Sequence, residues 1–314
     1  MLFPERSEGE EAGGAGALTP LLDDSFSRWL VGFTDGDGCF SIIKQGGKFS
    51  LNFYITQSTY NEQILYRIKK QLKVGSVTIY KKEAIYRIRS RSILSQVIFP
   101  IFDRFPLLTS KQFNYNKLKK AYNILEDHHL SREQKNHLCD QLKQQKPPEG
   151  YLSPAWHSSN SGNFTRLLVR QVMHIDWLIG FLEAEGSFFL TEKEAGRFVH
   201  SFGITQKRDA HVLEAIRLIF KIRAKVQHNK KNDFYKLETS AQPACLRIIH
   251  FLTGRLKSKK SFEFQLWKRS MRYLHSPRRY EKLSHVKCIL KNFRSKNRGP
   301  RNNIKDQGIV RSAK

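Results

Sequence analysis

The sequence is short of acidic residues. Its 314 residues include 28 Asp and Glu against 55 Lys and Arg, which gives a formal net charge of +27 and a pI near 10.0. Positions 1–24 hold six acidic residues and one basic residue, a net charge of −5, so the remaining residues carry +32. Positive charge of this size repels itself within a compact fold, and it therefore indicates a polyanionic partner such as nucleic acid.

Features typical of several other protein classes are missing as well. No run of 18 apolar residues occurs, which excludes a transmembrane helix. The four cysteines are scattered without C-x-x-C or zinc-type spacing, so we expect free thiols in a reducing compartment. No glycine-rich phosphate-binding loop joins a strand to a helix. The hydrophobic content of 39% and the aromatic content of 12% nevertheless suffice for buried cores.

The chain does contain one segment twice. Residues 29–42 read WLVGFTDGDGCFSI and residues 177–190 read WLIGFLEAEGSFFL, with six identities and six conservative replacements. A repeat of this length predicts two copies of one structural unit. Each copy carries two acidic residues, and these are Asp35 and Asp37 in the first copy and Glu183 and Glu185 in the second.

Three further segments recur at an offset of 148 or 149 residues. They are 55–57 with 204–206, 86–88 with 235–237, and 108–111 with 256–259. Each unit is therefore about a hundred residues long, the usual size of a small domain. The organisation that we predict is a disordered acidic extension (1–24), a first unit (25–126), a linker with a short helix (127–172), a second unit (173–275) and a basic tail with one short helix (276–314).

Hydrophobic spacing and turn residues predict the same order of elements in both units. In the first unit we expect helices at 28–36, 60–73, 91–102 and 110–126, and strands at 38–45, 48–57, 76–81 and 84–89. In the second we expect helices at 174–184, 209–222, 242–252 and 259–275, and strands at 186–194, 197–206, 225–230 and 233–239. The predicted fold class is α+β, with two pseudo-symmetric αββαββα units that each contain a four-stranded antiparallel sheet.

Small residues recur along one side of each motif helix. Gly32 and Gly36 are four residues apart, as are Gly180 and Ala184. Residues at this spacing share a helix face, and small side chains let two helix backbones approach closely. We therefore expect the two motif helices to pack against each other at a pseudo-twofold axis, with their C-termini converging.

The convergence would bring one acidic residue of each motif to the same place. Asp37 and Glu185 end the two helices, whereas Asp35 and Glu183 lie two residues earlier and must point elsewhere. We assign the first pair to a metal site and the second pair to orientation or capping around it. The alternative, that all four acids only terminate helices in a DNA-binding scaffold, remains open.

Electrostatics favours a cation at this point. Two carboxylates beside two helix C-termini add negative charge to the negative ends of two dipoles. A hard divalent cation, Mg²⁺ or Mn²⁺, relieves that repulsion and takes oxygen ligands. The expected ligands are Asp37, Glu185 and the carbonyls of Gly36 and Ala184. A cation held in this way can promote phosphodiester hydrolysis.

WLVGFTDGDG and WLIGFLEAEG resemble the LAGLIDADG homing endonuclease motif, present twice as in the single-chain members of that family. The likeness extends over roughly residues 27–275. It implies two saddle-shaped sheets over the DNA major groove, with the motif helices at the interface. It also implies that Asp37 and Glu185, the last acid of each motif, bind the metal ions that cleave one strand each across the minor groove.

The resemblance further implies a glutamine and a lysine that order water in each half. Gln57 and Gln206 match the glutamine, and Lys111 and Lys259 match the lysine. A lysine near the scissile phosphate stabilises charge or tunes the pKa of a water, although chance can account for a lysine match in so basic a chain. Some members carry a basic residue four positions beyond the glutamine, and here those positions hold Asn61 and Ala210.

Sequence recognition is expected from the polar faces of the sheets, because a β-ribbon fits a major groove. The candidates in the first unit are Lys44, Lys48, Asn52, Tyr54, Arg87 and Arg89. Those in the second unit are Lys193, Arg197, Ser201, Gln227, Lys236 and Glu238. Each of them is equally consistent with a solvated surface residue or a phosphate contact. Because the two faces differ, we expect an asymmetric double-stranded target that is read by a monomer.

The first hypothesis is therefore a site-specific, metal-dependent DNA endonuclease that is encoded within an intron and cuts both strands of a long asymmetric target. Two alternatives remain: an RNA maturase that assists splicing of its host group I intron, and a non-cleaving DNA-binding protein on the same scaffold. The acidic extension is unlike an organelle transit peptide. If the protein works in a chloroplast or mitochondrion, we therefore expect it to be encoded there.

Overall fold

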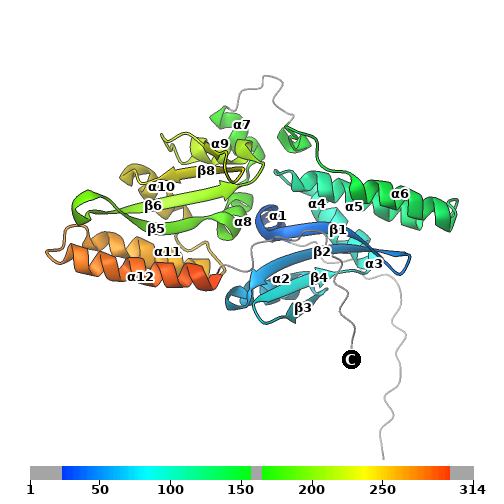
Figure 1. Cartoon of the computed structure of the whole chain (residues 1–314), viewed down its shortest axis with the longest axis horizontal. Helices are drawn as coiled ribbons and strands as arrows, with labels where there is room; N and C mark the ends of the chain where they lie inside the picture. The colour runs from blue at the N-terminus through cyan, green and yellow to red at the C-terminus, as the bar shows by residue number, and fades with distance from the viewer. Residues whose placement is uncertain (1–22, 157–164, 298–314) are drawn as a thin grey trace, which may run out of the picture.

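The computed structural model describes residues 23–156 and 165–297. Two units of the same plan lie side by side, with helices α1 (Asp24–Asp37) and α8 (Ile175–Glu185) between their sheets (Figure 1). Most of the predicted disordered extension and the end of the predicted basic tail lie outside the described ranges. Within those ranges, no helix is long and apolar enough to cross a membrane.

The first unit follows the predicted order of elements. After α1 it contains β1 (Gly38–Gln45), β2 (Lys48–Ser58), η1 (Thr59–Asn61), α2 (Gln63–Leu72), β3 (Ser76–Ile79), β4 (Glu83–Ile88), α3 (Arg91–Ile93), η2 (Leu94–Ile98), α4 (Phe99–Arg104) and α5 (Lys111–Glu126). The predicted helix at 91–102 is interrupted by the π-helical turn η2, where the Phe99 N–H donates to the Leu94 carbonyl. Pro100 follows and has no N–H with which to continue a regular α-helix.

The second unit repeats this order. After α8 it contains β5 (Ser187–Glu192), η4 (Glu194–Gly196), β6 (Phe198–Gln206), α9 (Ala210–Ile219), β7 (Gln227–Asn229), β8 (Phe234–Thr239), α10 (Gln242–Leu252), α11 (Lys260–Ser270), η5 (Met271–Tyr273) and α12 (Arg279–Asn297). The β7 strand is shorter than the prediction of 225–230. The differences elsewhere are confined to the ends of elements.

The region between the units is more helical than predicted. Helix α6 (Arg132–Gln144) is the predicted linker helix, and it begins at a capping box formed by Ser131 and Gln134. The following part contains η3 (Pro154–Trp156) and the unpredicted α7 (Arg166–Val172). Thr165 caps α7, because its side chain accepts a hydrogen bond from a main-chain N–H of the first turn.

Both sheets are four-stranded and antiparallel, which confirms the α+β class. The strand orders, β1-β2-β4-β3 and β5-β6-β8-β7, are the same. The predicted hairpin between β1 and β2 turns at Gly46 and Gly47, whose φ angles are +54° and +72°. A two-residue hairpin turn of this kind requires positive φ at both positions, which glycine adopts without steric cost.

One predicted match between the units is wrong by two residues. Ile55 of β2 pairs with Tyr86, whereas its counterpart Ile204 of β6 pairs with Leu237 rather than Tyr235. Two more residues lie between the central strand and its partner in the second unit. Because side chains alternate along a strand, a slip of two residues leaves every side chain on the predicted face.

Helices α1 and α8 pack so closely that their main chains touch. A Cβ atom on Gly32 would lie 1.9 Å from the carbonyl oxygen of Trp177. In the mirrored position, a Cβ on Gly180 would lie 2.1 Å from the carbonyl oxygen of Trp29. Only glycine fits at either point, which confirms the predicted packing through the small residues.

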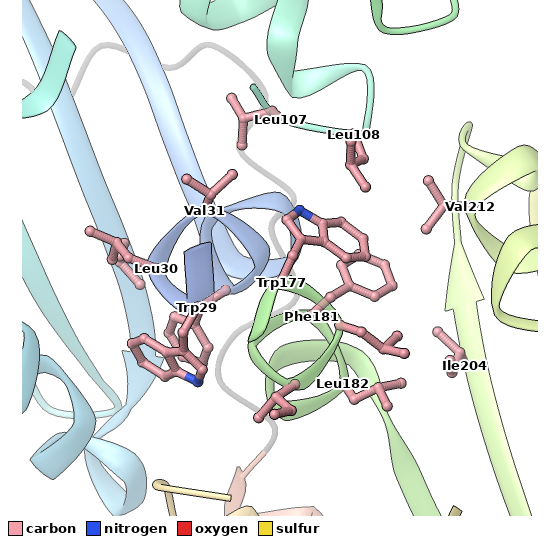
Figure 2. Close-up of a cluster of buried hydrophobic side chains, with 14 of the residues drawn as sticks. Trp29, Leu30, Val31, Leu107, Leu108, Trp177, Phe181, Leu182, Ile204 and Val212 are labelled. Carbon is pink, nitrogen blue, oxygen red and sulfur yellow. The ribbon is translucent and has the colours of Figure 1, made fainter. Parts of the chain in front are cut away.

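The outer flanks of these two helices enter separate cores. Figure 2 shows Leu30 and Val31 pointing from α1 toward the first sheet, and Phe181 and Leu182 pointing from α8 toward Ile204 of the second. All five side chains are fully buried. Burial of each large apolar side chain contributes roughly 1.5–3 kcal/mol, so these side chains fix each motif helix to its own sheet.

Helices α6 and α12 occupy equivalent places beside the β1–β2 and β5–β6 hairpins. Lys44 of β1 forms an ion pair with Asp140 of α6. At the corresponding place, Glu192 of β5 pairs with Lys287 of α12 at 2.6 Å. The linker helix and the tail helix are therefore matching parts of the two units, and their charges are exchanged.

The tail helix is longer and more buried than predicted. Helix α12 has 19 residues instead of the short helix that the sequence suggested. Leu283, Val286 and Leu290 are buried against the second unit. Near its end, the Phe293 ring lies 5.9 Å from the ring of Tyr60 in η1 of the first unit. This helix therefore contacts both units.

Candidate active site

Asp35 is buried in the interface and holds the segment that leads into α5. Its carboxylate accepts hydrogen bonds from the Trp177 indole at 2.8 Å, from the N–H groups of Leu108 (2.8 Å) and Thr109 (3.1 Å), and from the Thr109 hydroxyl at 2.5 Å. Burial raises the pKa of Asp35 to about 6, although these donors act in the opposite direction. Every lone-pair direction of this carboxylate is occupied by the protein.

Glu183 makes the mirrored set of contacts in the second unit. It accepts from the Trp29 indole at 2.9 Å, from the Lys257 N–H at 2.5 Å and from the Ser258 N–H. Each of these two acids thus accepts an indole N–H from the opposite motif helix. The exchange ties α1 and α8 together and fixes the start of the helix that follows each sheet.

Asp37 and Glu185 meet at the other side of the interface, where both helices end. A Cβ on Gly36 would lie 2.2 Å from the Ala184 Cβ and 3.2 Å from the Glu185 Cγ. Burial raises the pKa of Asp37. Burial and the neighbouring Asp37 raise the pKa of Glu185 to about 7. The two carboxylates therefore repel each other as the sequence argument anticipated.

One glutamine reaches each of these acids from the end of the central strand. Gln57 donates from Nε2 to Asp37 Oδ2 at 2.6 Å, and Gln206 hydrogen-bonds to Glu185. Both glutamines stand at the strand ends, at the positions that the sequence comparison matched. The amide nitrogen of a glutamine can donate to a carboxylate and orient it, while the amide oxygen accepts from a second partner.

Two lysines approach the helix ends, and one of them differs from the prediction. Lys111 Nζ donates to the carbonyls of Gly36 (2.5 Å) and Thr34 (3.0 Å). Its counterpart is Lys260, which donates to the carbonyls of Gly186 (2.5 Å) and Ala184 (3.4 Å).

The predicted Lys259 is therefore not the structural equivalent of Lys111. Its ammonium group lies 5.6 Å from the centre of the Tyr60 ring, away from the carboxylates. The offset of 149 residues that holds for the strand-end glutamines leads from Lys111 to Lys260. The shorter offset of 148, taken from the match of 108–111 with 256–259, misplaced the lysine by one residue.

Each lysine helix is also held by a side chain from the other unit. Asp209 accepts from the Ser110 N–H at 2.7 Å and from its hydroxyl at 3.1 Å, just before Lys111. At the mirrored place, Asn61 Oδ1 accepts from the Lys259 N–H at 3.0 Å. Asn61 also donates to Gln57 Oε1 at 2.7 Å. The sequence showed only that Asn61 replaces a basic residue, and nothing in it singled out Asp209.

The donor set at the helix ends suits a hard cation. In the described part of the chain, no three His, Cys, Asp or Glu side chains come together as a metal site. A cation here would be held by the two carboxylates with main-chain oxygens and water, which is the all-oxygen environment preferred by Mg²⁺. The carbonyls of Gly36 and Ala184, predicted as ligands, accept from Lys111 and Lys260 in this structure.

The predicted recognition residues lie on one face of each sheet, with one exception. Tyr54 pairs with Arg87, and Arg89 donates to Asn52 at 3.1 Å, all on the face opposite the core. Ser201 contacts Thr191 on the equivalent face of the second sheet. The remaining candidates on these faces or at their turns are Lys48, Lys193, Arg197, Gln227, Lys236 and Glu238.

Lys44 is the exception, and its predicted place was wrong. It pairs with Phe49, whose side chain lies on the core side of the sheet. Its ammonium group lies 5.3 Å from the centre of that ring and pairs with Asp140. Lys44 therefore faces helix α6, because its parity along β1 is that of Ile42 and not that of Ser41.

The open face of the second sheet continues to the carboxylates. A groove of about 370 Å³ runs from Glu185 over Ser187 and Thr191 to Lys236 and Glu238. The last two residues lie on the same face of β8 and form an ion pair with each other. The candidate recognition surface and the candidate site are thus one continuous surface.

Two regions of the chain match the sequence pattern of LAGLIDADG endonucleases, residues 30–122 and 178–271. They cover more than half of the chain and contain both motifs. The chain belongs to the LAGLIDADG endonuclease family. Members of this family are hydrolytic nucleases that use divalent metals, and the two-unit fold described above is the fold of its solved members.

The family assignment is supported by a closely similar relative. The probable intron-encoded endonuclease Cox1-I1b of Schizosaccharomyces pombe is 39% identical over 287 residues, which is 87% of this chain and 70% of that protein. A mitochondrial protein of Saccharomyces cerevisiae, RF1, is 28% identical over 79% of this chain, and the chain spans only 55% of its length.

Solved LAGLIDADG endonucleases share the fold. The homing endonuclease I-GzeII in complex with its DNA target has a TM-score of 0.68 at 23% identity, covering 83% of this chain and 96% of its own. I-SmaMI, bound to an uncleaved DNA target in the presence of calcium ions, has a TM-score of 0.67 at 19% identity, covering 84% of this chain and 98% of its own.

Proposed function

We propose that this chain is a site-specific endonuclease that cuts both strands of a long, asymmetric DNA duplex with the help of divalent cations. The observation that carries the proposal is the meeting of Asp37 and Glu185 at the ends of α1 and α8. Two carboxylates with raised pKa values at one point of a strongly basic protein need a cation more than any other partner.

In this proposal each motif acid serves one DNA strand. Asp37 and Glu185 hold Mg²⁺ or Mn²⁺, with the carbonyls of Gly36 and Ala184 available once their lysines move to substrate. The bound cation supplies activation of water and stabilisation of the leaving 3′ oxygen. The protein positions these groups on rigid helix ends, so that little reorganisation accompanies the reaction.

The glutamines and lysines act around the carboxylates. Gln57 and Gln206 hold Asp37 and Glu185 in place and orient the attacking water. Lys111 and Lys260, whose charges act on both carboxylates, stabilise the negative charge that develops on the scissile phosphates. We propose Lys260 for this role in the second unit, in place of Lys259.

Target recognition belongs to the two open sheet faces. Their polar side chains differ between the units, with Arg87 in the first and Glu238 in the second at equivalent positions. An arginine and a glutamate hydrogen-bond to different base edges, so the two half-sites should differ in sequence. One chain supplies both faces, and the proposed active form is a monomer.

The biological setting follows from the relatives. One of them is named as an intron-encoded endonuclease and another as a mitochondrial protein. We therefore propose that the chain is encoded within an organelle intron and cuts the intronless form of its host gene. A mitochondrial intron is the favoured setting, because both relatives are fungal.

The test uses a supercoiled plasmid that carries the joined exons flanking the reading frame. Purified protein is incubated with the plasmid in Mg²⁺ or in EDTA. Nicked and linear products are separated on a gel, and strand-specific labels identify which strand was cut. Wild-type protein should linearise the plasmid only with Mg²⁺. Asp37→Asn and Glu185→Gln should each nick one strand, and the two variants should nick opposite strands.

A matched control removes an acid elsewhere. Glu149→Gln neutralises an exposed carboxylate of the region between the units and should cleave as wild type does. Cleavage by a variant that combines Asp37→Asn with Glu185→Gln, or cleavage in EDTA, would contradict the assignment of the acids. Binding of the duplex without any nicking would favour a non-cleaving DNA-binding protein, and selective binding of the host intron RNA would favour a maturase.

A further inference from the structure

A basic cleft lies at the outer end of the first unit, away from the paired acids. It has a volume of about 380 Å³ and lies between the start of β2, the segment that enters α3, and helix α6. Five basic side chains line it, and no acidic side chain does. These are Lys48, Arg89, Arg91, Arg132 and Lys135.

The cleft exists because the first sheet is incomplete at this point. Strand β4 pairs with β2 only as far as Phe53, opposite Ile88. Residues 48–52 of β2 therefore have β1 on one side and no described strand on the other. Helix α6 runs beside this hairpin (Figure 1), and its residues Arg132, Lys135 and Asn136 line the cleft.

The charges of the five basic side chains are only partly neutralised by the protein. Arg91 forms an ion pair with Glu126 at 2.8 Å, and Lys135 donates to a main-chain carbonyl of α5. Lys48 and Arg132 form no ion pair with any described residue, and both are exposed. Uncompensated positive charge around a concave surface favours an anionic ligand.

The equivalent place in the second unit has a different lining. Tyr280 of α12 lies there, with its ring 5.5 Å from that of Phe198 and about 3.0 Å from where a Cβ on Gly196 would lie. The positions equivalent to Arg89 and Arg91 hold Ser240 and Gln242. Two of the basic residues of the cleft therefore have no basic counterpart in the second unit.

We propose that this cleft binds a backbone phosphate of the target duplex on the outer flank of the first unit. The proposal rests on the proposed DNA-cleaving function, and it gives two of the candidate recognition residues, Lys48 and Arg89, a phosphate-binding role together with the other basic residues of the cleft. Lys48 lies nine residues before Gln57 along β2, roughly 30 Å at the rise of a strand. The phosphate would therefore lie about nine base pairs from the centre of cleavage, at about 3.4 Å per base pair.

The experiment measures coupling between the cleft and one flank of the DNA. Binding of the exon-junction duplex is measured in Ca²⁺, which is intended to keep the duplex intact, for wild type, Arg132→Gln and the double variant Lys48→Gln/Arg132→Gln. Each protein is tested on the full duplex and on duplexes cut back to about six base pairs from the centre on either flank. Lys70→Gln, an exposed lysine on α2, is the charge-matched control.

The cleft predicts an effect on one flank only. Shortening that flank should weaken wild-type binding roughly three- to tenfold. It should also lower the slope of log affinity against log salt concentration by about one, as expected for the loss of one or two phosphate contacts. The double variant should bind the full duplex as weakly as wild type binds the shortened one, and should lose nothing more on shortening. Lys70→Gln should behave as wild type does. Thermal unfolding of each variant checks that the fold is kept.

Three results would overturn the inference. Equal sensitivity of wild type and the double variant to shortening of both flanks would show that the phosphate contact lies elsewhere, while the endonuclease proposal stands. If the double variant lost affinity for the host intron RNA but bound the duplex as tightly as wild type does, the cleft would be assigned to another ligand. Failure of the wild type to bind the full duplex at all would overturn the proposed function, and this inference with it.

Discussion

The two units solve the same packing problem with opposite charges. In the first, the cation over the hairpin phenylalanine comes from the strand, where Lys44 lies 5.3 Å from the Phe49 ring. In the second it comes from the tail helix, where Lys287 lies 5.3 Å from the Phe198 ring. A carboxylate on the other element completes each set. The arrangement of a cation over an aromatic ring is retained, while the element that provides each charge is not.

The interface between the units follows the opposite rule. Gly32 and Gly180 are identical, and so are the tryptophans whose indoles cross to the opposite acid. Main-chain contact leaves no space for an alternative side chain, whereas a surface pair can be exchanged at little cost. The comparison teaches that this fold is fixed at its centre and variable at its ends.

The largest expected effect comes from the fixed centre. Gly32→Ala and Gly180→Ala should each lower the free energy of unfolding by about 3 kcal/mol or more, because the new methyl group meets a main-chain oxygen. Urea denaturation measures the loss. Gly46→Ala, in a hairpin turn with open space around it, should cost only about 1 kcal/mol from backbone strain. Equal losses at the three positions would contradict the close packing.

The next effect distinguishes the lysines of the two halves. Lys111→Met and Lys260→Met should each slow cleavage of one strand about a hundredfold, as is usual when a group that stabilises transition-state charge is lost. Lys259→Met should change either rate less than about threefold, since its ammonium group lies over the Tyr60 ring and away from the carboxylates. Strand-resolved nicking rates measure both effects. A larger effect at Lys259 than at Lys260 would restore the shorter repeat offset.

A third effect is confined to the core of the second unit. His200 is buried where the first unit has Leu51, and its Nε2 lies 2.7 Å from the Ser270 hydroxyl. Burial lowers the pKa of His200 to about 4. Between pH 6.5 and 4 the unfolded chain therefore binds a proton that the folded chain does not, so stability is lost as the pH falls.

The His200→Leu variant tests that linkage. Its free energy of unfolding should fall less than that of wild type between pH 7 and pH 4, by up to about 3 kcal/mol, when both are measured by urea denaturation at each pH. Leu51→Ala in the first unit should weaken the fold equally at both pH values. Parallel pH profiles for wild type and His200→Leu would rule out a role for this histidine in acid sensitivity.

The smallest effect belongs to the exchanged charges. Lys44→Glu should cost less than about 1 kcal/mol, since both members of its ion pair are more than one-third exposed and are screened by solvent. The double variant Lys44→Glu/Asp140→Lys, which copies the charges of the second unit, should recover most of that loss. Thermal unfolding at low and high salt measures both. Lys44→Ala should also leave DNA affinity unchanged, because its side chain faces α6.

Signals that are local or duplicated made most of the fold predictable. The motif repeat, the Gly46-Gly47 turn and the alternation along the strands depend only on neighbouring residues, and they gave the two α+β units and the helix packing. The assignment of Asp37 and Glu185 to one place followed from the same small residues. These features needed no information about distant contacts.

The misplaced residues share a different cause. Short similar segments were used to align the two units, but the connections between those segments differ in length. The alignment was therefore shifted by two residues at Tyr86 and by one residue at Lys259. Helices α6 and α12 are assigned by the sequence to a linker and a tail, because their exchanged charges hide the equivalence between them. Asp209 acts on a segment 99 residues away, and no local pattern announces such a contact.

The glycine contact between α1 and α8 has a consequence for how such proteins can diversify. Because each helix end carries one of the two proposed catalytic carboxylates and the helices meet backbone to backbone, the interface alone would set the spacing between the two proposed cuts. A half taken from a related enzyme with the same glycines, tryptophan and acids should dock here without redesign. Hybrid nucleases that join two half-sites of different origin are therefore accessible by exchange at the region between the units.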